Sequence, residues 1–181
     1  MIQEIPMNNY LDVNIQTKRL TLIPVSEKYI DDITTHFTAE ITKYMWPKTP
    51  KPKTEITNHI ISKRNEMQDC KELMMVILLR ENNSFLGVCS IHKANTDTPE
   101  LGIWLKKSAH GNKYGVESIE ALKKWAELHL VYIYLKYPVD KKNIPSRNIA
   151  ESLSGKIEDE YLKKSESGVI LDEVEYRFYK Q

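Results

Sequence analysis

The sequence has little of what polyanion-binding, disulfide-bonded and membrane-spanning proteins require. Its 181 residues carry 26 Lys and Arg against 25 Asp and Glu, and the resulting net charge of +1 disfavours a protein that coats nucleic acid or anionic lipid. Its two cysteines, Cys70 and Cys89, have neither the spacing of a metal site nor that of a redox pair. The longest apolar run, residues 73–79, is far shorter than the roughly 18 residues that cross a bilayer.

The first six residues also lack the basic and apolar segments of a signal peptide. We therefore expect a cytoplasmic protein with no nucleic-acid or membrane partner. Hydrophobic residues at 41% and charged residues at 28% suffice for a packed core and argue against disorder. The length fits a single domain over residues 1–181, in which residues 1–15 form an irregular lead-in.

Hydrophobic periodicity predicts a mixed α/β (α+β) domain. Strands are expected at residues 19–25, 73–79, 85–91, 100–105, 131–139, 156–162 and 169–179, and helices after Ser26, after Thr54, at 114–130 and from Ser146. The central strands form two successive antiparallel hairpins, and residues 100–139 form a βαβ unit with parallel strands. The expected architecture is a mixed central sheet of about six or seven strands with flanking helices.

The segment from Trp46 to Lys53 contains three prolines and three lysines but no acidic residue. Proline removes backbone donors and fixes φ, so we expect an extended loop here. Its lysines could attract an anionic substrate, and the alternative is a solvated loop without a specific role.

A short polar loop, residues 108–113, contains Gly111 and leads into the long helix at 114–130. Backbone N–H groups at such a helix start, together with the helix dipole, suit a phosphate or pyrophosphate. Many loops of this kind bind nothing, so the loop alone does not decide the function.

The order of several motifs is more informative, because it resembles the GNAT superfamily of acyl-CoA-dependent N-acyltransferases. The branch that it resembles most includes the ribosomal-protein N-terminal acetyltransferases. The matching segments are Thr-Lys-Arg-Leu-Thr-Leu at 17–22, Phe-Leu-Gly-Val at 85–88, Glu-Leu-Gly-Ile-Trp-Leu at 100–105, His-Gly-Asn-Lys-Tyr-Gly-Val-Glu at 110–117, Asn-Ile-Pro-Ser at 143–146 and Leu-Asp-Glu-Val-Glu-Tyr at 171–176.

The resemblance implies a GNAT fold with a splayed acyl-CoA-binding βαβ unit, and acetyl-CoA as the co-substrate. The implied reaction is direct attack of a primary amine on the thioester in a ternary complex. The amine belongs to a protein N-terminus or to a small molecule such as an aminoglycoside, a polyamine or an amino sugar. The cofactor-binding residues that it implies are Ile103, Trp104, Leu105, His110, Gly111, Asn112, Lys113, Tyr114, Gly115, Asn143 and Ser146.

Three positions depart from the family pattern. His110 replaces the usual Gln or Arg of the loop, Lys113 replaces its inner glycine, and residues 153–156 lack a Gly-Phe pair. Lys113 has less backbone freedom than glycine but could offer an ammonium group to phosphate. These departures keep open a noncatalytic or degenerate GNAT-fold module that acts in CoA sensing or protein interaction.

Direct transfer needs a route for the amine proton and donors for the oxyanion. Glu100, at the start of its strand, could accept that proton directly or through water, or could be only a solvated acid. Backbone N–H groups around Ile103 and Trp104 would meet the oxyanion, although the Trp104 side chain could equally belong to the core. Trp46 is a weaker candidate for contacting the acceptor.

The leaving thiolate needs a proton donor, and Ser146 is the candidate. Ser146 could also simply cap the short helix that follows. Tyr134 and Tyr137 are alternative acids, although tyrosines in a strand commonly serve packing. Asn143 is expected to hold the pantetheine amides, with a turn residue as the alternative.

No metal is expected, because His36, His59, His92 and His129 show no ligand spacing. Direct transfer also requires no cysteine nucleophile, and Cys89 is expected to be buried. Edge strands of this fold allow a homodimer, which no motif in the sequence specifies.

Overall fold

The computed structural model describes residues 8–47 and 52–180, and within them the chain forms one sheet of eight strands. The predicted loop at 46–53 falls partly on residues 48–51, which lie outside the described residues, as do residues 1–7. The strands are β1 (Ile15–Gln16), β2 (Leu20–Pro24), β3 (Leu73–Leu79), β4 (Phe85–His92), β5 (Glu100–Leu105), β6 (Tyr134–Asp140), β7 (Lys156–Lys164) and β8 (Ile170–Tyr179).

The sheet order is β1-β2-β3-β4-β5-β6-β8-β7, and its neighbours are antiparallel except for β5 and β6. The expected mixed sheet and βαβ unit are therefore confirmed. One strand exceeds the expected six or seven, because the end of the lead-in pairs with β2 through Ile15 and Gln16.

Five α-helices accompany the sheet in the described part of the chain. They are α1 (Ile30–His36), α2 (Ala39–Thr42), α3 (Lys53–Gln68), α4 (Tyr114–His129) and α5 (Ile144–Ser152), with 3₁₀ turns at Glu27–Tyr29 and Lys107–Ala109. None of these described helices is long and apolar enough to cross a bilayer.

Three predicted helix starts differ from the observed ones. A 3₁₀ turn follows Ser26 before α1 begins, and Pro52 precedes the first residue of α3, so Thr54 lies inside that helix. Ser146 does not start α5, because the side chain of Asn143 accepts from the Ser146 N–H at 3.3 Å and caps the helix. The Ser146 hydroxyl is thus available for another partner.

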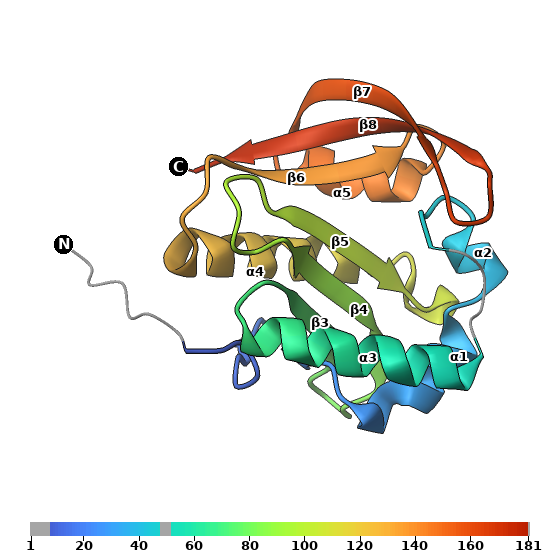
Figure 1. Cartoon of the computed structure of the whole chain (residues 1–181), viewed down its shortest axis with the longest axis vertical. Helices are drawn as coiled ribbons and strands as arrows, with labels where there is room; N and C mark the ends of the chain where they lie inside the picture. Colours follow the sequence, from blue (N-terminus) through green and yellow to red (C-terminus); the bar gives the residue numbers. More distant parts are fainter. Residues whose placement is uncertain (1–7, 48–51, 181) are drawn as a thin grey trace.

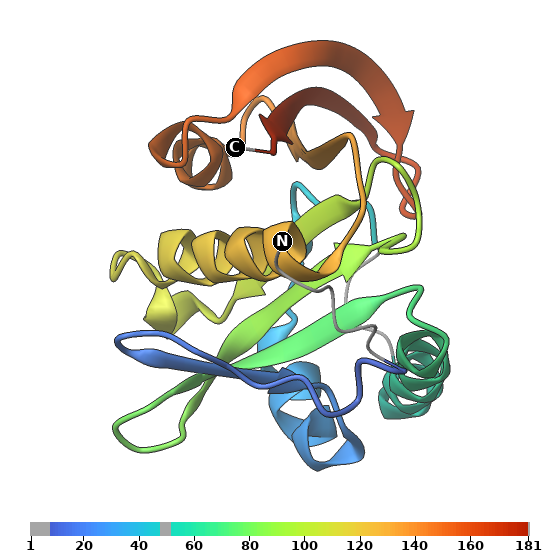
Figure 2. The ribbon, with the colours of Figure 1, turned by 90° about the vertical axis from the view of Figure 1, so that its left-hand side faces the viewer.

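The helices cover the two faces of the sheet separately (Figures 1 and 2). α1 and α3 lie on one face and α4 and α5 on the other. The inward side of α4 buries Ile119, Leu122 and Ala126 completely. Each large side chain buried in this way contributes about 1.5–3 kcal/mol, so α4 is firmly fixed against the sheet.

The parallel pair β5 and β6 diverges soon after it begins. Over the described residues of the two strands, pairing is limited to Glu100 with Lys136, next to a bond from the Lys136 N–H to the Pro99 carbonyl of 2.8 Å. β5 stays paired to β4 along its whole length. One side of β5 is therefore free beyond its first residue, and β6 runs away from it toward α5 (Figure 1).

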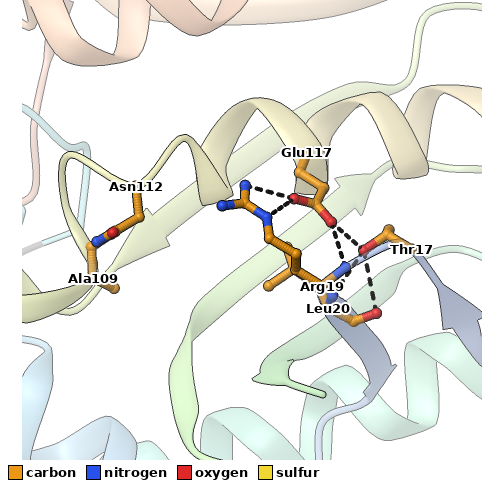
Figure 3. Close-up of polar contacts among 6 residues, drawn as sticks. All are labelled: Thr17, Arg19, Leu20, Ala109, Asn112 and Glu117. Atoms are coloured by element: carbon orange, nitrogen blue, oxygen red, sulfur yellow. Dashed lines mark hydrogen bonds and ion pairs between the residues drawn. The ribbon is translucent and has the colours of Figure 1, made fainter. Parts of the chain in front are cut away.

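The first turn of α4 is tied to the β1–β2 connection by Glu117 (Figure 3). Its carboxylate accepts from the Thr17 hydroxyl at 2.6 Å, from the Arg19 N–H at 2.9 Å and from the Arg19 guanidinium at 2.7 Å. Burial opposes ionisation of Glu117, but these hydrogen bonds and the Arg19 charge outweigh it and lower its carboxyl pKa. The Arg19 guanidinium also lies 4.6 Å from the centre of the Tyr114 ring.

Glu117→Ala is expected to lower the free energy of unfolding by about 2 kcal/mol, because it leaves charged and backbone donors without their acceptor. The pKa of Glu117 is lowered in the folded state. Its contribution to the free energy of unfolding is therefore complete above the pKa of an unfolded glutamate, ~4.3, and is lost as the pH falls through the lower pKa of the folded state. Urea unfolding should show the difference between wild type and variant narrowing below pH ~4.

Glu120→Ala on the same helix is the matched control. Glu120 forms an exposed ion pair with Lys124 at 2.7 Å, and its loss should change the free energy of unfolding by less than about 0.5 kcal/mol. Equal effects of the two variants would contradict the role assigned to Glu117.

Candidate functional site

The free side of β5 presents backbone groups rather than side chains to the gap beside β6. The Lys106 N–H donates to the Leu86 carbonyl at 2.8 Å. Because every second residue of an antiparallel strand bonds to its neighbour, this bond shows which residues of β5 bond to β4. Trp104 and Gly102 therefore bond to β4, whereas the N–H and C=O groups of Ile103 and Leu105 face the gap. Of the two residues expected to meet an oxyanion, Ile103 is the one whose N–H points there.

Trp104 contributes its side chain to packing. Its ring lies 5.0 Å from the centre of the Phe37 ring and 5.8 Å from that of Phe85. The core alternative considered for this residue fits the structure, and its side chain forms part of the wall of a neighbouring cavity.

The loop after β5 is held by its own polar side chains. The His110 ring Nε2 lies 3.0 Å from the Leu105 carbonyl oxygen, and the Asn112 amide donates to the carbonyls of Ala109 and His110 at 3.3 and 3.0 Å. Asn112 thus shapes the loop (Figure 3). Gly111 has φ +79°, a conformation that favours glycine.

Lys113, directly before α4, adopts the left-handed conformation with φ +61° and ψ +16°. The backbone therefore keeps the geometry that an inner glycine would adopt with less strain. Gly115 is needed for a different reason, because an added Cβ would lie 2.6 Å from Cδ1 of Ile149 on α5. The start of α4 is thus held close to α5, with the α4 dipole directed at the loop.

Residues from β6 and α5 meet on the other side of the gap. The Tyr137 hydroxyl lies 2.8 Å from the Ser146 hydroxyl. Asn143, which caps α5, comes three positions before Ser146 in the chain. Burial raises the pKa of Tyr137 to about 12, although the hydrogen bond to Ser146 lowers it. Tyr137 is therefore protonated at neutral pH and can donate. Tyr134 instead packs on Tyr179, with ring centres 5.7 Å apart.

A cavity of about 790 Å³ adjoins the gap, and Ser146, Asn143 and Tyr137 line one end of it. Trp46 and Glu100 line it as well, so the two candidates for contacting the acceptor share one space. This size suits a small organic ligand or a peptide end.

An acid–base cluster at the α3 side of the cavity was not found by sequence reasoning. The Glu72 side chain is only 3% exposed, and its carboxylate lies 2.5 Å from Nδ1 of His92 and 3.4 Å from the Lys63 ammonium. The signal in the sequence was weak, because Glu72 stands before one strand and His92 ends the next. Their contact follows only from the register of β3 and β4.

Glu173 of β8 is a second buried carboxyl group that lines the cavity. Burial and the neighbouring charges of Glu100 and Asp140 raise its pKa, against the opposing effect of Lys163 and a hydrogen bond from Tyr161. The described residues contain no cluster of His, Cys, Asp or Glu that could hold a metal ion.

With this geometry in place, comparison with known proteins decides the family. The acetyltransferase (GNAT) domain family matches residues 19–156, more than half of the chain. The chain belongs to this family. The expectation of a GNAT acetyltransferase is thereby confirmed, and the match includes β5, the loop and α4. No curated protein matches the chain by sequence.

Solved structures confirm the GNAT fold. An acetyltransferase from Salmonella typhimurium that modifies the N-terminal serine of ribosomal protein L7/L12 has 18% identity and a TM-score of 0.79 over 93% of this chain and 100% of its own. The L7/L12 α-N-protein acetyltransferase RimL, in complex with coenzyme A, has 19% identity and a TM-score of 0.81 over 92% and 98%. The expected branch is thus among the structural neighbours.

A third structure widens the range of acceptors in the neighbourhood. The microcin C7 self-immunity acetyltransferase MccE, in complex with acetyl-CoA and AMP, has 20% identity and a TM-score of 0.78 over 90% of this chain and 93% of its own. At such identities the likeness concerns the fold alone.

Gly111→Ala and Lys113→Gly should change stability in opposite directions. Alanine at φ +79° is strained even though no described atom lies within 4 Å of its Cβ, and it should cost about 1 kcal/mol. Glycine at residue 113 should relieve strain and add about 0.5 kcal/mol. Urea unfolding measures both.

Lys106→Gly is the matched control for the second variant. Lys106 has φ −60°, so glycine relieves no strain there. It should only raise the conformational entropy of the unfolded chain and thereby lower the free energy of unfolding. If Lys113→Gly destabilised as much as Lys106→Gly, the strain assigned to Lys113 would be absent.

Proposed function

We propose that the protein transfers the acetyl group of acetyl-CoA to a primary amine by direct attack in a ternary complex. The observation that carries this proposal is the divergence of β5 and β6 beside a cavity of about 790 Å³. It leaves backbone groups of β5 free next to a space where an amine can meet a thioester. The family match supports the reaction class.

The cofactor would lie across the gap. Its pantetheine arm would pair with the free backbone of Ile103 and with the Leu105 N–H, because the His110 ring already contacts the Leu105 carbonyl. Asn143, which lines the same cavity, would lie opposite. Its pyrophosphate would meet the residues from His110 to Gly115, where the loop N–H groups and the α4 dipole favour an anion. Coenzyme A and acetyl-CoA in the structures of RimL and MccE support this assignment of the donor.

The residues that line the cavity would include a donor and an acceptor of protons for the reaction. Ser146 would protonate the departing thiolate, and Tyr137 would support it by donating to the Ser146 oxygen. Glu100 would draw the acceptor ammonium into the cavity and is the first candidate for its proton. The Ile103 N–H would stabilise the oxyanion that forms on the attacked carbonyl.

The acceptor is a primary amine from a protein N-terminus or from a small molecule, namely an aminoglycoside, a polyamine or an amino sugar. An acceptor protein is supported by the L7/L12 enzymes among the neighbours. The noncatalytic alternative loses one of its grounds, since Lys113 preserves the left-handed conformation of the loop.

Acetyl-CoA should bind the wild-type protein in calorimetry, with an affinity that falls as salt increases, because the loop meets phosphate groups. Lys113→Gln should weaken binding about threefold by removing one cation near the start of α4, and should flatten the salt dependence. The control Lys124→Gln removes an exposed charge farther along α4 and should change nothing. No binding at millimolar acetyl-CoA would overturn the proposed function.

Ser146→Ala should lower kcat about 100-fold while acetyl-CoA affinity stays nearly the same, because the hydroxyl acts on the leaving thiolate. Tyr137→Phe should lower kcat less, by about tenfold, because its hydroxyl acts through Ser146. Tyr134→Phe is the control. The assay follows the released thiol with a serine-initiated peptide, spermidine, an aminoglycoside and glucosamine as acceptors, and an unchanged kcat for Ser146→Ala would remove that residue from the mechanism.

A further inference from the structure

The cluster of Glu72, His92 and Lys63 is built like a catalytic base rather than a surface ion pair. Glu72 is almost fully buried at the end of the loop before β3, and its two carboxylate oxygens contact different partners. Oε1 lies 2.5 Å from Nδ1 of His92, and Oε2 lies 3.4 Å from Nζ of Lys63. A buried carboxylate in this arrangement fixes the ring of the histidine beside it.

The other ring nitrogen of His92, Nε2, lies over β5 beside Gly102. A Cβ added to Gly102 would lie 2.9 Å from Nε2 of His92, so this nitrogen sits over β5 one residue before Ile103. His92 lines the cavity and its side chain is 38% exposed. Nε2 is therefore within reach of an amine that attacks a carbonyl held at the Ile103 N–H.

The role of base requires one particular tautomer of His92. Oε1 of Glu72 is buried and has no hydrogen-bond partner among the described residues, and its 2.5 Å approach to Nδ1 is an ion-pair contact. In the proposed reaction the neutral ring would carry its proton on Nδ1, beside this oxygen, and leave a lone pair on Nε2. The ammonium group of Lys63 lies 3.4 Å from the other carboxylate oxygen of Glu72. Burial lowers the pKa of Lys63, but the charges of Glu72 and Glu66 outweigh burial and raise it, so this ammonium stays charged beside the carboxylate.

We propose that His92 takes the proton of the acceptor amine through Nε2, and that Glu72 is the residue that positions its ring. This inference rests on the proposed acetyl transfer and names the base for it. Glu100, directly across the β4–β5 pair from His92, then acts as the carboxylate that draws the ammonium in. An imidazole, with a reference pKa of ~6.5, accepts a proton at neutral pH better than an ordinary carboxylate does.

The proton balance closes with His92, Ser146 and solvent water, to which the His92 imidazolium gives up its proton after the transfer. The ammonium N–H proton passes to Nε2, the amine nitrogen forms its bond to the acetyl carbon, and the carbon–sulfur bond breaks. The amide nitrogen loses its remaining excess proton to water, and the thiolate receives one from Ser146, which water replenishes. No oxidant, reductant or metal ion enters these steps.

The cavity that His92 lines carries acids and lysines in equal number. Besides Tyr44 and Tyr137, its other titratable side chains are His59, Lys63 and Glu66 of α3, Lys71 and Glu72 before β3, Lys93 after β4, Glu100 of β5, Lys163 of β7 and Glu173 of β8. The acids and the lysines of this set number four each, and Glu72 is the one in direct contact with the imidazole.

The decisive experiment compares kcat against pH for wild type, His92→Gln and Glu72→Gln, at saturating acetyl-CoA. The acceptors are a serine-initiated peptide, whose α-amine has a pKa of ~8, and N-α-acetyl-lysine amide, whose amine has a pKa of ~10.4. Wild-type kcat should rise through an ionisation between pH ~5 and ~8, and His92→Gln should lower kcat about 100-fold and remove that ionisation. Its defect should be larger with the lysine amine, which is harder to deprotonate.

Glu72→Gln should lower kcat about tenfold and move the ionisation in the pH profile, which a merely structural role would not do. His129→Gln, at the end of α4 against Trp125, is the matched histidine control and should leave the profile unchanged. Acetyl-CoA binding by calorimetry should be equal in all four proteins, and this checks that each is folded.

An unchanged profile in both His92→Gln and Glu72→Gln, with kcat near wild type, would overturn the role of His92 while leaving the proposed function intact. Failure of the wild type to acetylate either probe or any amine of the wider panel would instead overturn the proposed function, and this inference with it. A loss of kcat in Glu100→Gln that also removes the ionisation would transfer the role of base to that residue.

Discussion

The separation of β5 from β6 is the constraint on which the rest of the site depends. A strand inside a sheet normally has both sides paired, because unpaired backbone groups in a buried position are costly. Here β5 keeps its bonds to β4 and gives up those to β6 after Glu100. α4 packs on one face of the strand, and the Phe37–Trp104 contact lies on the other.

The same separation divides the chemistry between the two faces of the sheet. Groups suited to an anionic cofactor, namely the loop, the start of α4 and the cap of α5, lie at the face that α4 covers. Charged side chains that can handle an amine lie under α3, on the opposite face. In the proposed reaction the cofactor and the amine would therefore approach β5 from different directions.

Sequence alone predicted seven of the eight strands, the two central hairpins and the βαβ unit, because buried strands and the amphipathic α4 have strong periodicity. It could not predict the left-handed Lys113, because a lysine side chain does not favour that conformation by itself. Nor could it predict the contact of Glu72 with His92, which requires the pairing of two strands to bring residues 20 positions apart together. The partner of the Ser146 hydroxyl depended on which residue caps α5; Asn143 is that cap, and the hydroxyl bonds to Tyr137 instead.

The Glu117 contact also decides the electrostatics of the loop that precedes α4. A carboxylate in the first turn of a helix would repel an incoming anion, but Arg19 is bonded to it and cancels its charge. Stacking on Tyr114 keeps the guanidinium there. The attachment of the amino-terminal strands and the charge balance at the start of α4 therefore depend on the same contact, and a change that released Arg19 from Glu117 would alter both together.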